Sequence, residues 1–393
     1  MQRSMRWLSM GLVVGLAATL AACSETKSTG SATGGDAGGE IKMGVVLDIT
    51  GAGASLGGPE RQAIEMLAEQ VNKAGGVNGR QIKLFIEDNQ STEDGAAKAA
   101  SKLLNTEKVD ILLGASRTGP SLAMRPLAEK AETPMISLAA NVKIVDGSKW
   151  VFKTAQNDRV VLEKMSEDMK AKGITKVAIA RDASGFGEGI PEMLADIGKS
   201  AGIEVVKVEK FAPDATDFTS QMTNLRAASP QAVLIWGIPP AAGLAQKAYA
   251  QLVGTNIPVY QSHGIGNQAF LDTAGDAAAG LRAPLGRMLV AGQLKDDDPQ
   301  KPVVTKFIAD FKAKYNASPS TFAGHAYDGF MIAVEALKKA GTDKAKLRDA
   351  IEATSKWPGV SGVFTMTPTD HSGLTKDALM IVTVDNKAWK VAG

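Results

Sequence analysis

Short apolar runs alternate with stretches of helical periodicity from residue 41 to residue 260, and this rhythm constrains the fold more than any other feature of the chain. Buried strands of a first series are expected at residues 41–49, 81–87, 109–113 and 134–138. Those of a second series are expected at residues 176–180, 204–210, 232–236 and 258–260. Strands that alternate with helices are typical of parallel sheets covered on both faces. Two such series predict two doubly wound α/β lobes.

The chain after residue 286 adds elements that belong to neither series. Helices are expected at residues 303–315, 326–340 and 344–353, and strands at 360–365 and 379–384. These late elements must return to both lobes. We therefore expect a first lobe of residues 40–157 plus 286–357. The second lobe is expected to comprise residues 158–285 plus 358–393.

The amino terminus resembles an export signal. Arg3 and Arg6 form a positive start, and residues 7–22 then carry no charge. This run is shorter than the ~20 residues of a spanning helix, and its small residues before Cys23 resemble a bacterial lipobox. We expect a lipoprotein signal peptide over residues 1–22, lipidation of Cys23 and a flexible Gly- and Ser-rich tether over residues 23–39. The predicted location is outside the cytoplasm, anchored by lipid to the cell membrane; a short membrane anchor is the alternative.

The charge balance and the cysteine count narrow the function. Lys and Arg number 44 against 42 Asp and Glu, and removal of residues 1–22 would leave 42 of each. A neutral chain offers no electrostatic attraction to nucleic acid. Cys23 is the only cysteine, which excludes a disulfide framework and a cysteine-based zinc site.

Ligands of open parallel sheets bind beyond the carboxyl ends of the strands, so the informative residues should follow strands. These positions are residues 48–51, 114–118, 139–141, 181–186, 236–239 and 261–263. The Gly51-Ala-Gly53 turn is similar to a dinucleotide-binding loop, but Leu56 stands where the third glycine should be. No nicotinamide or other cofactor is therefore expected.

Two further enzyme-like patterns are present. Ser116 lies in a Gly-rich turn that lacks the spacing of a nucleophile elbow, although histidines for a Ser-His pair exist. A periplasmic hydrolase therefore stays an alternative. His325 and Asp328 could place two metal ligands on one helix face, but such a pair is more often a pocket wall and a structural acid. We expect neither a metal nor a catalytic residue.

Four segments, taken in their order after a lipobox, are similar to one known family. They are residues 44–51 with 58–64, residues 72–79, residues 181–189 and residues 324–329. Residues from about 40 to about 390 resemble the type I solute-binding proteins of ATP-driven importers, in the branched-chain amino-acid branch. The resemblance implies two lobes joined by a three-strand hinge, which close over one small molecule. It also implies delivery to a membrane permease, no chemical step and a monomer.

The segment of Ser116 and Thr118 is the candidate seat for a carboxylate. Pro120 pre-organises the first turn of the helix that follows, and a helix N-terminus offers free N–H groups beside the two hydroxyls. Either hydroxyl could instead be a simple N-cap. The resemblance places Ala139, Ala140 and Asn141 at the same seat, with Ala139 acting through its backbone and Asn141 through its side chain. It also assigns pocket walls or lid contacts to Leu56, Phe186, Trp236, His325 and Tyr327. For Trp236 and Tyr327 a place in the core is the alternative.

One position departs from the family pattern. Amino-acid binders of this family carry an acid after the last strand of the second lobe, where this chain has His263 followed by a glycine. Neutral imidazole pairs poorly with an ammonium but can donate to a phenol, carbonyl or carboxylate. A His-Gly pair here resembles some aromatic-acid binders of the family. We therefore expect a small carboxylate, with an aromatic acid favoured over a branched-chain amino acid, although Asp182 could supply the acid. A ligand sensor for a signalling receptor remains an alternative role.

Overall fold

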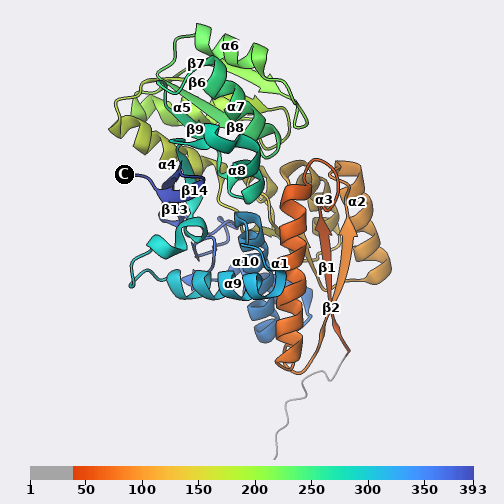
Figure 1. Cartoon of the computed structure of the whole chain (residues 1–393). Helices are drawn as coiled ribbons and strands as arrows, with labels where there is room; N and C mark the ends of the chain where they lie inside the picture. Colours follow the sequence, from red (N-terminus) through yellow and green to blue (C-terminus); the bar gives the residue numbers. More distant parts are fainter. Residues whose placement is uncertain (1–38) are drawn as a thin grey trace, which may run out of the picture. The chain divides into compact units, whose positions relative to one another are not determined.

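The computed structural model describes residues 39–393 (Figure 1). The predicted signal peptide, Cys23 and all but the last residue of the tether lie outside the described residues. Among the helices of the described part, none combines the length and apolar character needed to cross a membrane.

A five-stranded parallel sheet with the order β2-β1-β3-β4-β5 forms the core of the first lobe. Its strands are β1 (Ile41–Leu47), β2 (Ile82–Asp88), β3 (Ile111–Gly114), β4 (Met135–Ser137) and β5 (Val151–Lys153). Every residue of β3 and β4 is buried, as expected for central strands covered on both faces. The helices between the strands are α1 (Ala54–Lys73), α2 (Glu93–Lys102) and α3 (Thr118–Lys130).

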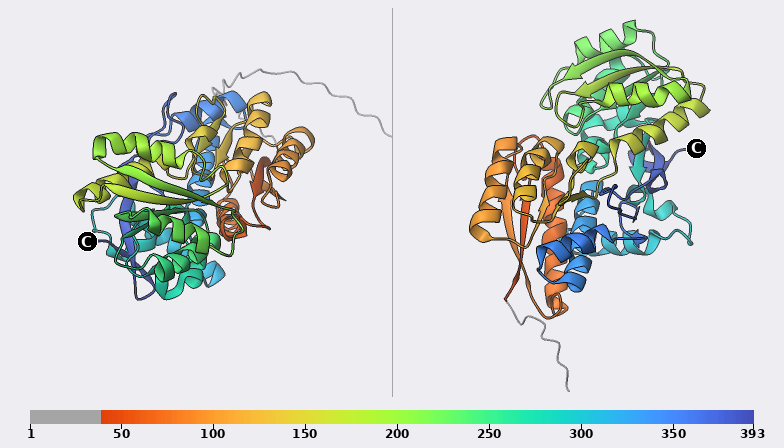
Figure 2. Two further views of the ribbon diagram at one scale, coloured as in Figure 1. Left: turned by 90° about the horizontal axis from the view of Figure 1, so that it is seen from above. Right: turned by 180° about the vertical axis from the view of Figure 1, so that it is seen from behind.

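Helices from the end of the chain complete the covering of this first sheet. They are α9 (Lys301–Tyr315), α10 (Thr321–Ala340) and α11 (Lys344–Glu352). Helix α10 packs along α1 and reaches β3 and β4. Figure 2 shows these late, blue helices beside the orange elements of the amino-terminal part. The late helices therefore pack with the amino-terminal elements around the first sheet.

A second parallel sheet, with the order β7-β6-β8-β9, forms the core of the other lobe. Its strands are β6 (Lys176–Asp182), β7 (Glu204–Phe211), β8 (Ala232–Trp236) and β9 (Val259–Gln261). Its helices are α4 (Asp158–Ala171), α5 (Ile190–Ala201), α6 (Thr219–Ala227), α7 (Ala241–Leu252) and α8 (Gln268–Ala274). The two-sheet α/β architecture expected from the sequence is present.

Two small antiparallel sheets follow near the carboxyl terminus. The first joins β10 (Ala283–Gly286), β13 (Leu379–Asp385) and β14 (Ala388–Val391), and a single bridge between Tyr260 and Arg282 links it to β9. The second pairs β11 (Trp357–Pro358) with β12 (Val363–Phe364). Strands β5, β10, β11 and β14 were absent from the expected elements.

Three separate chain segments lie side by side between the two parallel sheets. Gln156 Nε2 donates to Ser361 O at 2.8 Å. A methyl group built on Gly286 would lie 3.4 Å from Gln156 Nε2 and 3.9 Å from Ser361 O. The segment after β5, the end of β10 and the turn between β11 and β12 thus meet at this point.

Two helices begin earlier than their sequence patterns predict. Helix α1 starts at Ala54 rather than residue 59, and Gly57 allows its first turns to approach β1, because a Cβ there would lie 2.2 Å from Asp48 O. Helix α10 starts at Thr321 rather than residue 326, because Ser320 caps it by accepting the Ala323 N–H.

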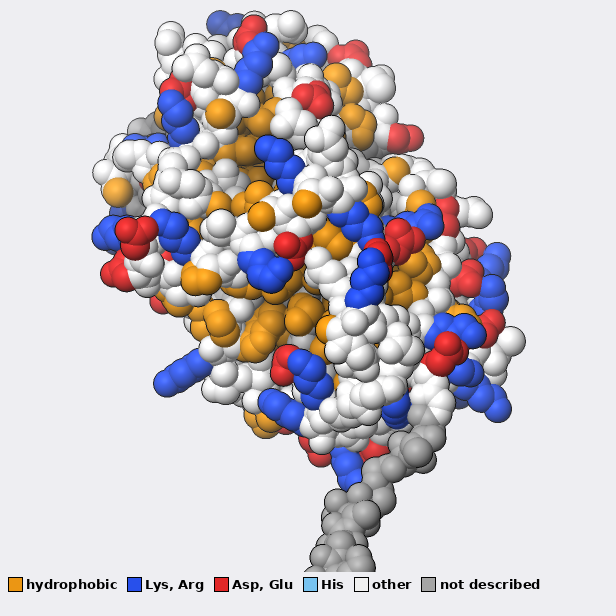
Figure 3. Space-filling view, turned by 60° about the horizontal axis from the view of Figure 1, so that its bottom comes forward, with side chains coloured by type: hydrophobic (Ala, Val, Ile, Leu, Met, Phe, Trp, Pro, Cys, Tyr) orange, Lys and Arg blue, Asp and Glu red, His pale blue; other side chains and the backbone are white. Residues whose placement is uncertain are grey.

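The charged groups on the face shown in Figure 3 are of both signs and interspersed.

Candidate functional site

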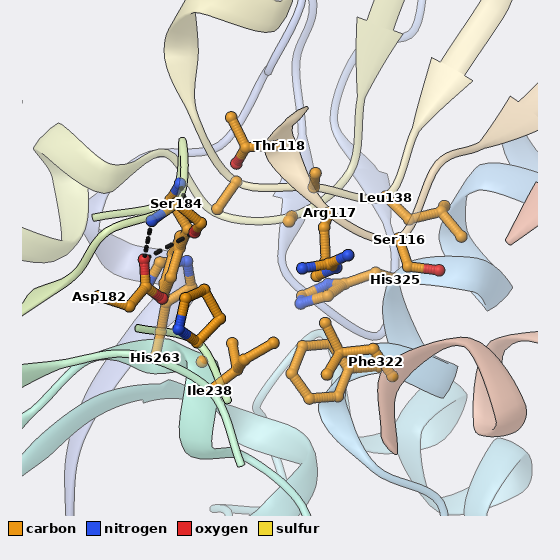
Figure 4. A pocket seen from close by; sticks show the side chains of 17 residues that line it. Ser116, Arg117, Thr118, Leu138, Asp182, Ser184, Ile238, His263, Phe322 and His325 are labelled. Carbon is orange, nitrogen blue, oxygen red and sulfur yellow. Dashed lines mark hydrogen bonds between the residues drawn. The ribbon is translucent and has the colours of Figure 1, made fainter. Parts of the chain in front are cut away.

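A cavity opens where the strands of both parallel sheets end, and it holds about 490 Å³ of empty space with its open side included (Figure 4). From the chain before residue 158 it is lined by Leu56, Ser116, Arg117, Thr118, Leu138, Ala139, Ala140 and Ala155. From the chain after residue 158 it is lined by Asp182, Ser184, Phe186, Pro213, Ile238, His263, Gly264, Phe322 and His325. Most of these residues directly follow β3, β4, β6, β8 or β9, so the cavity lies where parallel sheets place their ligands.

Eight of the eleven predicted ligand-binding residues line this cavity. They are Leu56, Ser116, Thr118, Ala139, Ala140, Phe186, His263 and His325. The other three, Asn141, Trp236 and Tyr327, do not line it. The lining residues that the sequence did not single out are Arg117, Leu138, Ala155, Ser184, Pro213, Ile238, Gly264 and Phe322.

Helix α3 points its amino terminus at the cavity, with Arg117 as an extended N-cap residue and no side chain capping the helix. Thr118 is 2% exposed, and its Oγ1 has no hydrogen-bond partner within residues 39–393. A buried hydroxyl without a partner at a helix N-terminus can donate to an anion without breaking another bond. Thr118 therefore meets the chemical requirement of a carboxylate seat.

The hydroxyl of Ser116, in contrast, is already engaged. It donates to the carboxyl of Glu60 on α1 and accepts the Asp48 N–H at 3.1 Å. Burial raises the pKa of Glu60 well above its usual value, the Ser116 hydrogen bond lowers it, and the neighbouring Asp48 raises it further. Ser116 thus joins the cavity to a buried acid, a contact that only the fold could reveal.

An ion pair between Arg117 and Asp48 lies on the same side of the cavity as Ser116. The Arg117 guanidinium contacts the fully buried Asp48 carboxylate and also donates to Ser91 O. Asn89 Nδ2 donates to the other Asp48 oxygen at 2.7 Å. Because Arg117 lines the cavity while it pairs with Asp48, its position is set by β1 and by the loop after β2.

Across the cavity, the last residue of β6 contributes an acid to the lining. Asp182 Oδ1 accepts the Ser184 N–H at 3.0 Å and the Ser184 hydroxyl at 2.6 Å, as the dashed lines in Figure 4 show. Burial raises the pKa of Asp182, although these hydrogen bonds oppose the rise. Asp182 is therefore the carboxyl group that the cavity offers to a ligand.

Phe186 supplies an aromatic wall, and Trp236 supports it from behind. Trp236 is 0% exposed at the end of β8, and its Nε1 donates to Phe186 O at 3.0 Å. The two ring centroids are 5.3 Å apart. The prediction of Trp236 as a wall is corrected here: the lining residue is Ile238, two positions further along, because Trp236 still belongs to the buried strand.

His263 stands at the end of β9 in the cavity wall, with its ring 5.5 Å from that of Phe186. Burial lowers the pKa of His263 to about 3, and His325 and Lys153 nearby add to this, so the imidazole is neutral. Its Nε2 lies 3.9 Å from Asp158 Oδ1. Burial raises the pKa of Asp158 to about 7, against the attraction of Lys153.

His325 reaches the cavity from helix α10, whereas Tyr327 does not. The Tyr327 ring packs against Phe307 on α9, 4.9 Å between centroids. Residues two apart on a helix point in widely different directions, so His325 and Tyr327 cannot both face one cavity. The prediction of Tyr327 as a pocket wall is corrected accordingly.

Asn141 connects two chain segments instead of lining the cavity. Its Oδ1 accepts the Lys143 N–H at 2.9 Å and caps the 3₁₀ turn Val142–Ile144. Its Nδ2 donates to Gly185 O at 3.0 Å, in the loop that follows β6. The predicted direct contact of Asn141 with a ligand is therefore corrected to a contact between the loops after β4 and β6.

Asp328 and Ser116, named above for a metal site and for hydrolysis, both have other hydrogen-bond partners. Residues 39–393 contain no group of three His, Cys, Asp or Glu side chains placed to hold a metal ion. Asp328 accepts the backbone N–H groups of Val360 and Ser361 at 2.6 and 2.7 Å. Ser116 hydrogen-bonds to Glu60 rather than to a histidine.

Comparison with known proteins agrees with this architecture. The sequence profile of the family described as periplasmic binding protein matches residues 40–388. The leucine-, isoleucine-, valine-, threonine-, and alanine-binding protein of Pseudomonas aeruginosa is 28% identical over 324 residues, which cover 80% of this chain and 83% of that protein.

Two solved structures are similar over 90% of this chain. An extracellular ligand-binding receptor from Rhodopseudomonas palustris HaA2 aligns over its full length with a TM-score of 0.85 and 28% identity. A branched-chain amino acid transporter substrate binding protein from Streptococcus pneumoniae, in complex with isoleucine, aligns over 99% of its length with a TM-score of 0.79 and 25% identity.

Proposed function

Since the chain belongs to the type I periplasmic binding proteins, the solute-binding proteins of ABC transporters, we propose that its cavity captures one small organic carboxylate for import. Members of this family bind substrates and work with membrane permeases, and they are not enzymes. The proposed ligand has an apolar body, aromatic in preference to branched aliphatic. Delivery to a permease without any chemical step is the proposed role.

The unpartnered hydroxyl of Thr118 is the observation that carries this proposal. It lies buried at the uncapped N-terminus of α3, inside a cavity whose walls are largely apolar. A ligand carboxylate would satisfy this hydroxyl and the free N–H groups of the first helical turn together. The Arg117 guanidinium beside them adds positive charge to the same seat.

The apolar walls support the aromatic body. Phe186, Ile238 and Phe322 offer flat or branched surfaces around the space next to the seat. A pair of packed aromatic rings contributes about 0.5–1.5 kcal/mol of favourable free energy beyond the contribution of the buried apolar area. Phe186 is held in place by Trp236, so its ring is a pre-organised face for another ring.

The neutral His263 argues against an α-ammonium on the ligand. A buried cation without an anion costs several kcal/mol, and imidazole cannot supply the missing charge. Asp182 favours the second candidate, a branched-chain amino acid, because its carboxyl lies in the cavity wall. The names of the Pseudomonas and Streptococcus relatives point to the same second candidate.

A thermal-shift screen separates the two candidates. Benzoate and 3-phenylpropenoate form one arm, and leucine, isoleucine and valine form the other. Ligand at ~100-fold over its dissociation constant adds about 2.7 kcal/mol, which is readily visible as a higher melting temperature. Stabilisation by the amino acids alone would refute the aromatic proposal.

Two substitutions sharpen this screen. Asp182→Asn removes the only acid among the lining residues and should abolish binding of amino acids while it spares aromatic acids. His263→Glu should shift preference toward amino acids. If Asp182→Asn weakens the binding of both ligand classes equally, Asp182 does not pair with the ammonium group of an amino acid.

We also propose the molecular context of this capture. Residues 1–22 would be the lipoprotein signal peptide, Cys23 the lipidated residue and residues 23–39 the tether. The proposed lobes are residues 40–157 plus 286–357 and residues 158–285 plus 358–393, closing over the ligand as a monomer. A sensor that docks a signalling receptor would use the same cavity, and loss of ligand uptake on deletion of the protein would favour the importer.

A further inference from the structure

A fully buried acid lies directly behind one wall of the cavity. Ser116 lines the cavity, and Glu60 of α1, which is 0% exposed, accepts a hydrogen bond from the Ser116 hydroxyl. Figure 4 shows the Ser116 side chain among those that line the cavity. A ligand in contact with Ser116 therefore lies only one side chain away from the Glu60 carboxyl.

Glu60 differs from the neighbouring acid Asp48 in the partners of its carboxyl group. Asp48 is paired with Arg117 and also accepts from Asn89. Within residues 39–393, Glu60 forms no ion pair with a Lys or Arg, and its Oε1 has no hydrogen-bond partner. Burial raises the pKa of Glu60, the bond from Ser116 lowers it, and the charge of Asp48 raises it. A negative charge on Glu60 is therefore costly, and another anion close by adds to that cost.

The hydroxyl of Ser116 has a single hydrogen atom, for which Glu60 and a ligand compete. Its oxygen already accepts the Asp48 N–H at 3.1 Å. A carboxylate only accepts hydrogen bonds, so an ionised Glu60 takes the hydroxyl hydrogen for itself. A protonated Glu60 carries a hydrogen of its own, which it can donate to Ser116, and the hydroxyl hydrogen is then free for a ligand carboxylate. Both the charge and the hydrogen bonds therefore oppose capture of an anion while Glu60 is ionised.

We propose that Glu60 couples carboxylate capture to proton uptake: as the ligand anion binds beside Ser116 and Thr118, Glu60 takes one proton from the solvent. This inference rests on the proposed capture of a carboxylate and adds its regulation by pH. Glu60 is a positioning residue, because it acts on the ligand through Ser116. One anion and one proton enter together, so the total charge buried around the carboxylate seat stays the same.

Carboxylate binding should consequently weaken as pH rises. Below the pKa of Glu60 in the free protein, this group already carries its proton, and binding takes up none. Above that pKa, each bound ligand requires the uptake of one proton, and the affinity falls by up to about tenfold per pH unit. By reciprocity, the bound ligand raises the pKa of Glu60.

Other groups near the cavity also titrate, so the test needs a variant that removes only Glu60. Apart from the pair of Asp48 and Arg117, the charged or titratable side chains around the cavity are Lys153, Asp158, Asp182, His263 and His325. Burial lowers the pKa of both histidines to about 3, so they stay neutral. Burial raises the pKa of Asp158 and lowers that of Lys153, which brings both groups closer to neutral pH. Only the difference between wild type and Glu60→Gln is therefore assigned to Glu60.

Titration calorimetry of benzoate in two buffers with different ionisation enthalpies counts the protons taken up on binding. Benzoate stays an anion near neutral pH, so any uptake is by the protein. In wild type we expect the uptake to rise toward one proton per ligand between about pH 6 and about pH 9. Glu60→Gln should lose this rise. No uptake by wild type across the range, or the same uptake by Glu60→Gln, would overturn the inference.

The affinity itself separates a proton-linked role from a merely structural one. The neutral amide of Glu60→Gln imitates the protonated acid, so this variant should bind benzoate about as tightly at high pH as wild type does at low pH. A loss of affinity by the same factor at every pH would show that Glu60 is only structural. Glu65→Gln is the matched control: Glu65 lies on the same helix, pairs with Arg61 and is 37% exposed, and its loss should leave the proton uptake unchanged.

The failure of the proposed function is distinguishable from the failure of this inference. If no carboxylate of the thermal-shift panel stabilises the wild-type protein, the proposed function fails and the role of Glu60 fails with it. If leucine stabilises the protein and benzoate does not, leucine becomes the probe, because it presents the same carboxylate. If an acid binds without proton uptake that depends on Glu60, the capture stands and only the inference fails.

Discussion

Replacement of Arg117 by alanine should lower the free energy of unfolding, because its ion-pair partner Asp48 is fully buried. Arg117 is 14% exposed and its partner Asp48 is 0% exposed, so the variant leaves a buried carboxylate without its cation. Removal of one partner of a buried pair typically costs about 3–5 kcal/mol. The hydrogen bond from Asn89 to Asp48 remains and moderates the effect. We therefore expect the free energy of unfolding to fall by about 3–4 kcal/mol.

Urea unfolding followed by circular dichroism measures this loss. Asp48→Asn in the same chain removes the stranded charge and should recover most of the stability. A loss below about 1 kcal/mol, or no recovery on addition of Asp48→Asn, would refute the account of this pair.

Three further predictions follow from other contacts. Glu60→Gln should become more stable relative to wild type as pH rises. Burial raises the pKa of Glu60, so the wild-type folded state loses stability as that group ionises. Urea titrations at several pH values test this, and parallel pH profiles of the two proteins would contradict it. Trp236→Phe leaves Phe186 O without its donor and should cost about 1–3 kcal/mol of unfolding free energy, whereas an unchanged midpoint would show that the bond contributes nothing. Cys23→Ala should prevent lipid modification and release the protein from the membrane fraction of a bacterial host, since two acyl chains give stable anchoring; equal fractionation of both forms would show that Cys23 is not the anchor.

The fold was largely predictable because central parallel strands are covered on both faces. Such strands read as continuous apolar runs, and β1, β3 and β8 lie where those runs are. The rule that ligands bind beyond the strand ends then located Thr118 and Phe186 without any knowledge of the cavity.

The sequence could not predict the direction of individual side chains or the partners of distant residues. Trp236 and Tyr327 are each two positions from a lining residue, but strand and helix geometry turns them into the core. The bond between His325 and Ser361 joins positions 36 residues apart, one on α10 and the other in the turn between β11 and β12. No local pattern marks Ser361, and the engagement of Ser116 by Glu60 is hidden for the same reason.

Titration calorimetry of the most stabilising acid from the panel tests the central claim most directly. We predict one molecule bound per chain, recovered chemically unchanged after release. Thr118→Val, which keeps the shape of the side chain and removes its unpartnered hydroxyl, should weaken binding about 2- to 12-fold. Equal affinity of wild type and Thr118→Val, or recovery of a modified product, would contradict the capture of a carboxylate at the N-terminus of α3.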